Sequence, residues 1–131
     1  MALAERAHGL SRLLVVLYAI FAIAATSRSA LQLATRFDEA PFAYLLSAVA
    51  ALVYVVATVA LAIGDRGRRV ATWSIGFELA GVITVGTLSI IDPALFPRAT
   101  VWSYYGAGYL LIPLALPIVG LWWLRRTHPV S

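Results

Sequence analysis

Residues 69–92 read RVATWSIGFELAGVITVGTLSIID, an apolar run long enough to cross a bilayer that carries one carboxylate, Glu78, in its interior. A bilayer core about 30 Å thick needs on the order of 20 apolar residues for one helical span. Glu78 lies roughly 13 Å past Arg69 at the helical rise of 1.5 Å per residue. An ionised carboxylate at that depth costs several kcal/mol, so we expect Glu78 to be protonated, paired or in contact with water.

The composition around this run is that of a membrane protein. Of the 131 residues, 62% are hydrophobic and 12% are charged, whereas soluble domains have about half apolar and about a quarter charged residues. A chain of this length holds at most about four spans joined by short loops. We therefore predict an all-α membrane protein, a four-helix transmembrane bundle that forms a single domain over residues 1–131.

The expected spans are the four apolar runs at about 11–34, 42–63, 70–91 and 104–124. The first run resembles the apolar part of a signal peptide, but it continues past the small residues at 22–24 without a helix breaker, which favours an uncleaved span.

Prolines and glycines set the expected helix ends. Pro41 suits the first turn of the second helix, a glycine in the loop 64–69 can end that helix, and Asp92 precedes a proline, which ends the third helix. Pro113 and Pro117 lie inside the fourth run, so that helix is predicted to be bent.

Arginine placement predicts the orientation, because cytoplasmic loops carry an excess of basic residues. Four spans put both termini and the middle loop on one side, and these three segments hold most of the arginines: Arg6, Arg12, Arg66, Arg68, Arg69, Arg125 and Arg126. Both termini are therefore expected in the cytoplasm. Trp102, Tyr104 and Tyr105 are expected at the outer interface. The chain has no lysine or asparagine, which indicates a GC-rich genome and, with it, a bacterial cell membrane (inner or plasma).

Glu78 is the centre of a candidate intramembrane polar site, whose members are Glu78, Ser74, Ser89, Tyr18 and Tyr54. The two serines project near Glu78 at about 100° per residue, and the two tyrosines lie at comparable depth on the first and second spans. One hypothesis makes Glu78 a proton- or cation-linked site in a cavity. The other makes it a protonated carboxyl hydrogen-bonded to a tyrosine hydroxyl or a carbonyl freed by proline.

The other side of the third helix carries small residues every four positions, namely Thr72, Gly76, Ala80 and Thr84. This pattern lets helix backbones approach closely in lipid. We therefore expect the third helix to be central, with neighbours on two sides.

A second candidate cluster lies toward the outer side. Arg28, Gln32 and Arg36 follow at four-residue spacing on the first helix, and Asp92 completes the group. Snorkelling side chains and surface ion pairs are one explanation. An anion or lipid-headgroup site centred on Arg28 is the other.

No catalytic or metal site is predicted. The chain has no cysteine, its two histidines lie near opposite ends, and the G-x-S-x-G, P-loop and H-E-x-x-H motifs are absent. No cofactor is expected. The arginines cluster at the ends of apolar runs, which argues against a nucleic-acid partner. The expected partners are the lipid bilayer and a homo-oligomer or larger membrane complex.

Residues 76–126, GFELAGVITVGTLSIIDPALFPRATVWSYYGAGYLLIPLALPIVGLWWLRR, resemble uncharacterised small integral membrane proteins of GC-rich Gram-positive bacteria of the actinobacterial type. The resemblance implies no activity. The expected role is that of a non-enzymatic accessory or interaction subunit. The alternatives are a small oligomeric proton- or cation-linked transporter or channel that uses Glu78, and, with least support, an enzyme that acts on lipid.

Overall fold

The computed structural model describes residues 2–96, 100 and 102–126, and these residues form helices and turns without a strand. The α-helices are α1 (Ala2–Thr35), α2 (Pro41–Ile63), α3 (Arg68–Ile91) and α4 (Ile112–Arg126). Short 3₁₀ segments connect them: η1 (Phe37–Glu39), η2 (Asp65–Gly67), η3 (Pro93–Leu95) and η4 (Ser103–Tyr109).

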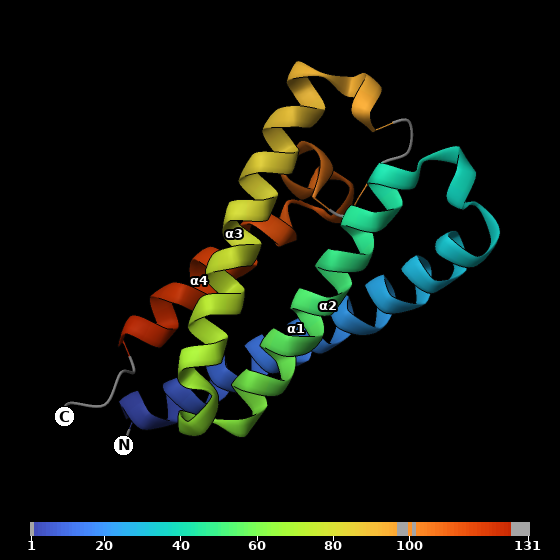
Figure 1. Ribbon diagram of the computed structural model, residues 1–131. Helices are drawn as coiled ribbons and strands as arrows, with labels where there is room; N and C mark the ends of the chain where they lie inside the picture. Colours follow the sequence, from blue (N-terminus) through green and yellow to red (C-terminus); the bar gives the residue numbers. More distant parts are fainter. Residues whose placement is uncertain (1, 97–99, 101, 127–131) are drawn as a thin grey trace.

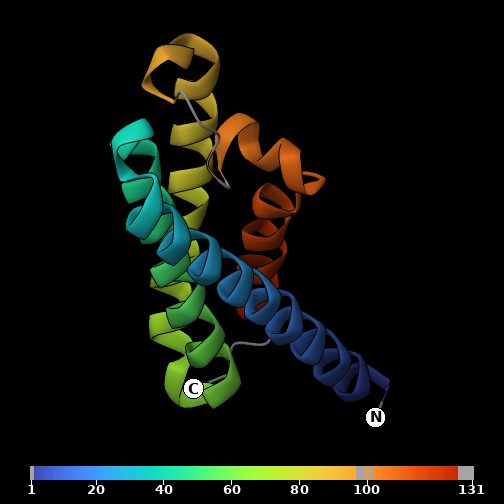
Figure 2. The same ribbon diagram turned by 90° about the vertical axis from the view of Figure 1, so that its right-hand side faces the viewer.

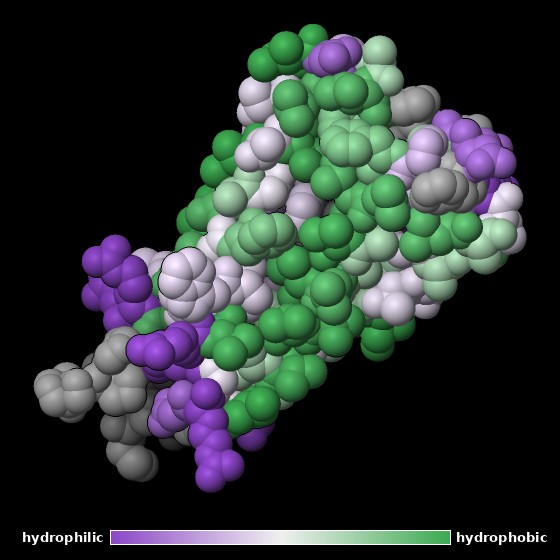
Figure 3. All heavy atoms as spheres, viewed as in Figure 1, coloured by the Kyte–Doolittle hydropathy of each residue, from purple (hydrophilic) through white to green (hydrophobic). Residues whose placement is uncertain are grey.

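Three of these helices are long and apolar enough to cross a membrane, over Gly9–Thr35, Pro41–Ile63 and Asp65–Ile91. A fourth span is present if η4 and α4, which are bent by 100° to each other, count as one broken span. Apolar side chains cover the middle of the visible face, and hydrophilic ones gather toward its ends (Figure 3). The all-helical fold with helices suited to a membrane is therefore confirmed.

The ends of the first three helices follow the local sequence signals. Pro41 is in the first turn of α2, where its missing N–H is not needed. Gly64 ends α2 with a φ of 88°, a value that glycine adopts without steric cost. Asp92 ends α3, and its N–H donates to the Leu88 carbonyl at 2.8 Å.

The fourth expected span is not a continuous helix from Tyr104. The backbone has positive φ values at Tyr104, Tyr105, Leu110 and Leu111, and α4 begins only at Ile112. Pro113 does not bend a helix here; it occupies the first turn of α4, because its ring would clash with the carbonyl one turn earlier if the helix continued backward. Pro117 does lie inside α4. The chain therefore turns sharply between η4 and α4, as Figure 2 shows.

The helices pack in sequence order, and α3 has the most varied neighbours. α1 packs along α2, α2 packs along α3, and α3 also contacts both η4 and α4. The start of α1, the end of α4 and the α2–α3 connection lie toward the same end of the molecule (Figure 1).

The expected close-packing face of α3 is not covered by the described part of the chain. The side chains of Thr72, Ala80 and Thr84 are exposed, and Gly76 has no non-neighbouring atom within 4 Å of the position of a Cβ. On α3 the closely packed glycines are instead Gly81, which contacts the Trp102 indole, and Gly86, which contacts Tyr105. The close approach predicted for the small-residue face within the chain was therefore wrong.

Candidate functional site

Glu78 is fully buried on the inner side of α3, with an exposed fraction of 0%. The Tyr18 hydroxyl, from α1, donates a hydrogen bond to Glu78 Oε1 at 2.7 Å. Tyr18 is itself 0% exposed, so this bond joins two helices in the absence of competing solvent. The predicted tyrosine partner of Glu78 is therefore present in the structure.

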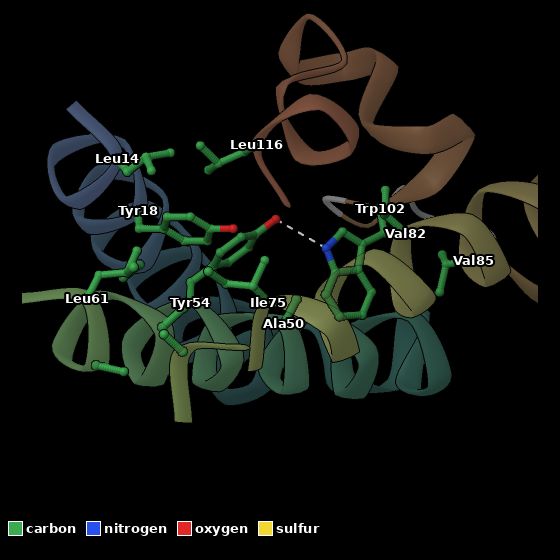
Figure 4. Packing of buried hydrophobic residues seen from close by; sticks show 14 of the residues in the cluster. Leu14, Tyr18, Ala50, Tyr54, Leu61, Ile75, Val82, Val85, Trp102 and Leu116 are labelled. Atoms are coloured by element: carbon green, nitrogen blue, oxygen red, sulfur yellow. Dashed lines mark hydrogen bonds between the residues drawn. The ribbon is translucent and has the colours of Figure 1, made fainter. Parts of the chain in front are cut away.

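Tyr54 brings α2 to the same place. Its ring centroid lies 6.1 Å from that of Tyr18, and its hydroxyl accepts a hydrogen bond from Trp102 Nε1 at 3.1 Å. In Figure 4 the hydroxyls of Tyr18 and Tyr54 lie near each other, and a dashed line marks the hydrogen bond from Trp102 to Tyr54. Glu78, Tyr18, Tyr54 and Trp102, which we call the buried polar core, thus connect α3, α1, α2 and the segment before η4.

α4 also approaches the buried polar core. A Cβ at Gly120 would lie 3.3 Å from the Ile75 side chain and 3.7 Å from the Tyr18 hydroxyl. These are tight or ordinary van der Waals distances. The lack of a side chain at Gly120 therefore lets α4 pack directly over the Tyr18 hydroxyl.

The second carboxyl oxygen of Glu78 has a different environment. Oε2 is buried and has no hydrogen-bond partner among the described residues. Neither carboxyl oxygen contacts an arginine in that part of the chain. A charged carboxyl would be uncompensated in this setting, at a cost of several kcal/mol. The arrangement suits a carboxyl that carries its proton and accepts one bond through Oε1.

The two serines predicted to join Glu78 do not bond to it. Ser74 Oγ donates to the Val70 carbonyl at 2.8 Å, one turn back on α3. Ser89 Oγ donates to the Val85 carbonyl at 2.7 Å. Both hydroxyls therefore donate to backbone carbonyls of their own helix. Of the predicted site, only Glu78 and the two tyrosines lie together.

The outer polar cluster is not assembled as predicted. Arg28 Nη1 donates a hydrogen bond to the Tyr109 hydroxyl, but Arg36 and Asp92 have exposed side chains with no hydrogen bond to Arg28 in the described structure. Gln32 is half-buried, and its Oε1 has no partner among the described residues. Of the four predicted members, only Arg28 therefore has a defined polar contact.

Sequence reasoning missed two site residues, Trp102 and Tyr109. Trp102 was expected at the outer interface, but its exposed fraction is 2% and its ring packs on Gly81. The signal that could have found it is Gly81 itself, because a glycine on the polar side of a helix leaves room for a large ring. Tyr109 gave no signal, because its position depends on the turn between η4 and α4.

No described cluster of three or more histidine, aspartate or glutamate side chains could hold a metal ion. Comparison with known protein families, with curated proteins and with solved structures gave no match to this chain.

Proposed function

We propose that this protein is a non-enzymatic accessory or interaction subunit of a bacterial cell membrane, a four-span bundle with both termini in the cytoplasm. The observation that carries the proposal is the uncovered small-residue face of α3, formed by Thr72, Gly76, Ala80 and Thr84. In lipid, small residues at this spacing allow a second helix to approach to backbone contact.

The side chains around this face support the same role. Trp73 is 76% exposed and Phe77 is 54% exposed, and at about 100° per residue both rings lie along one side of the small-residue face. A helix from a second copy, or from another membrane protein, could pack over Gly76 and against these rings. The bond between Glu78 and Tyr18 is on the opposite side of α3 and is sealed from solvent, so it does not take part in this surface.

Gly76→Ile should weaken the association strongly without disturbing the fold. No atom outside the helix lies within 4 Å of a Cβ at Gly76, so the isoleucine fits the isolated subunit but blocks close helix approach. A photoreactive residue in place of Phe77, a large exposed side chain beside the face, should give a defined crosslinked species in native membranes, and Gly76→Ile should reduce its yield by about tenfold.

The matched control is Ala62→Ile, which creates the same side chain at an exposed position of α2 and should leave the crosslink unchanged. Equal yields in Gly76→Ile and the unmodified chain would contradict the proposed interface. The mass of the crosslinked species distinguishes a second copy from a different protein.

One observation favours a second candidate, a small oligomeric proton- or cation-linked transporter or channel. Glu78 Oε2 is buried without a partner in the described structure, so it could bind a proton or cation that arrives by a transient path. This candidate requires Glu78→Gln to abolish pH-driven flux in proteoliposomes. Unchanged flux in a normally folded variant would rule it out.

A further inference from the structure

A small cavity lies between α1, α2 and η4, and the Phe21 ring, whose centroid is 5.6 Å from that of Tyr54, links its described lining to the buried polar core. Its volume is about 100 Å³, and Phe21, Arg28, Ser29, Ser47 and Tyr109 are among the residues that line it. A water molecule takes about 30 Å³ of liquid volume. The cavity therefore has room for a group the size of a few waters, such as a phosphate or a carboxylate.

The turn between η4 and α4 creates this cavity. Leu110 and Leu111 have φ values of 60° and 61°, and the chain bends by 100° there. The bend brings Tyr109 against α1, where its ring centroid lies 6.0 Å from that of Phe21 in an edge-on arrangement. The Tyr109 hydroxyl then meets the guanidinium of Arg28.

Polar groups converge on the cavity from two helices and η4. Ser29 is 4% exposed, and its Oγ is buried without a hydrogen-bond partner in the described structure. Ser47, from α2, is 9% exposed. A guanidinium has five N–H donors, and the described residues offer Arg28 one acceptor, the Tyr109 hydroxyl. The N–H donors of Arg28 therefore outnumber the acceptors that the described residues offer it in this cavity.

The charge of the cavity is also unbalanced. Among the residues that the structure describes, Arg28 is the one charged residue that lines the cavity, and no acid lines it. Arg28 precedes the end of α1 at Thr35 by seven residues, or about 10 Å along the helix. The Arg28 side chain is exposed on α1, so a group from the surrounding membrane can reach it. Oxyanions are the acceptors that match the planar array of donors on a guanidinium.

We infer that this cavity binds the oxyanion group, phosphate or carboxylate, of an anionic ligand, with Arg28 as the charged contact and Ser29 Oγ as a second donor. A lipid headgroup is the source that the surface favours. Ile20 and Ile23, which precede Arg28 on α1 and so lie deeper in the span, are 55% and 70% exposed and give an acyl chain apolar surface to lie on.

The test compares the protein in nanodiscs of phosphatidylcholine with nanodiscs that also contain phosphatidylglycerol, and measures bound lipid by native mass spectrometry. The protein should retain phosphatidylglycerol in preference to phosphatidylcholine. Arg28→Gln should weaken that preference by about tenfold, because a hydrogen bond to a charged group is lost. Arg36→Gln, at an exposed position just after the end of α1, should leave it unchanged.

Two further measurements keep the inference falsifiable. If Arg28→Gln loses helical content, Ser29→Ala takes its place and should weaken the preference by about threefold. Inorganic phosphate added to phosphatidylcholine nanodiscs tests the free anion: a rise in the melting temperature that Arg28→Gln or Ser29→Ala removes identifies the ligand as free phosphate. The inference is overturned if neither phosphatidylglycerol nor phosphate binds, or if the folded variant binds them as the unmodified protein does.

Discussion

Replacing Glu78 by alanine is expected to lower the free energy of unfolding by about 3 kcal/mol, while Glu78→Gln lowers it by about 1 kcal/mol. The alanine removes the acceptor of the Tyr18 hydroxyl and leaves a cavity beside a side chain that is 0% exposed. The glutamine keeps an oxygen acceptor and the volume, but it adds an amide donor where Oε2 has no partner in the described structure. Reversible denaturant unfolding in mixed micelles measures both values.

The Tyr18→Phe variant removes the hydroxyl that bonds to Glu78 and keeps the ring, so it measures the contribution of this hydrogen bond to stability. If the bond links α1 and α3 as the structure shows, the effects of Tyr18→Phe and Glu78→Ala should overlap by about 1 kcal/mol in the double variant. Additive effects would show that the bond contributes nothing to stability. A Glu78→Ala variant as stable as the unmodified protein would contradict a structural role for the carboxyl.

The second large effect is expected at the glycines of α3, where the same substitution should have opposite outcomes at two positions. Gly86→Ala should cost about 2–3 kcal/mol, the range for overpacking a filled site. A Cβ at Gly86 would lie 2.7 Å from the Tyr105 backbone nitrogen and closer still to its ring. Tyr105 would have to move, and its hydroxyl would lose the Thr87 Oγ1 partner now at 2.9 Å.

Gly76→Ala is the matched control on the same helix. No non-neighbouring atom lies within 4 Å of its Cβ position, and alanine is favoured over glycine in a helix interior by up to about 1 kcal/mol. The same unfolding measurement, made on the monomer in micelles, should show a neutral or stabilising effect. Loss of stability in Gly76→Ala equal to that in Gly86→Ala would contradict the packing of η4 on α3.

The sequence predicted the helices well where local signals dominate. The apolar runs are long, and Pro41, Gly64 and Asp92 each impose a backbone constraint that needs no tertiary contact. The bond between Tyr18 and Glu78 was within reach for a similar reason. A buried carboxyl in lipid needs a partner, and tyrosines at comparable depth were available on the first and second spans.

The region around η4 could not be predicted in the same way. Its turn uses φ values of 53° to 61° at Tyr104, Tyr105 and Leu110, a region that non-glycine residues rarely occupy. Such conformations hold only when surrounding packing requires them, and that packing involves Gly81 and Gly86, which lie far away in the chain. Trp102 and Tyr109 were therefore misplaced or missed, and with them the cavity beside Arg28.

The two faces of α3 have different roles in the proposed function. The inner face is occupied by the bond from Tyr18 to Glu78 and by the Trp102 ring, which holds the helices together. The outer face of Thr72, Gly76, Ala80 and Thr84 has no partner helix within the described chain. A carboxyl fixed in this way holds α3 with its small residues facing outward, where the proposed partner helix would pack.

The protonation state of Glu78 in the membrane tests this account most directly. Infrared difference spectra of the reconstituted protein against Glu78→Gln should show one protonated carboxyl C=O band at neutral pH, because the group is buried and has no described cationic partner. The band should persist when the external pH is raised within the stable range of the protein. A carboxylate signal at neutral pH, or a band that follows the external pH, would contradict a structural Glu78 and favour the transport alternative.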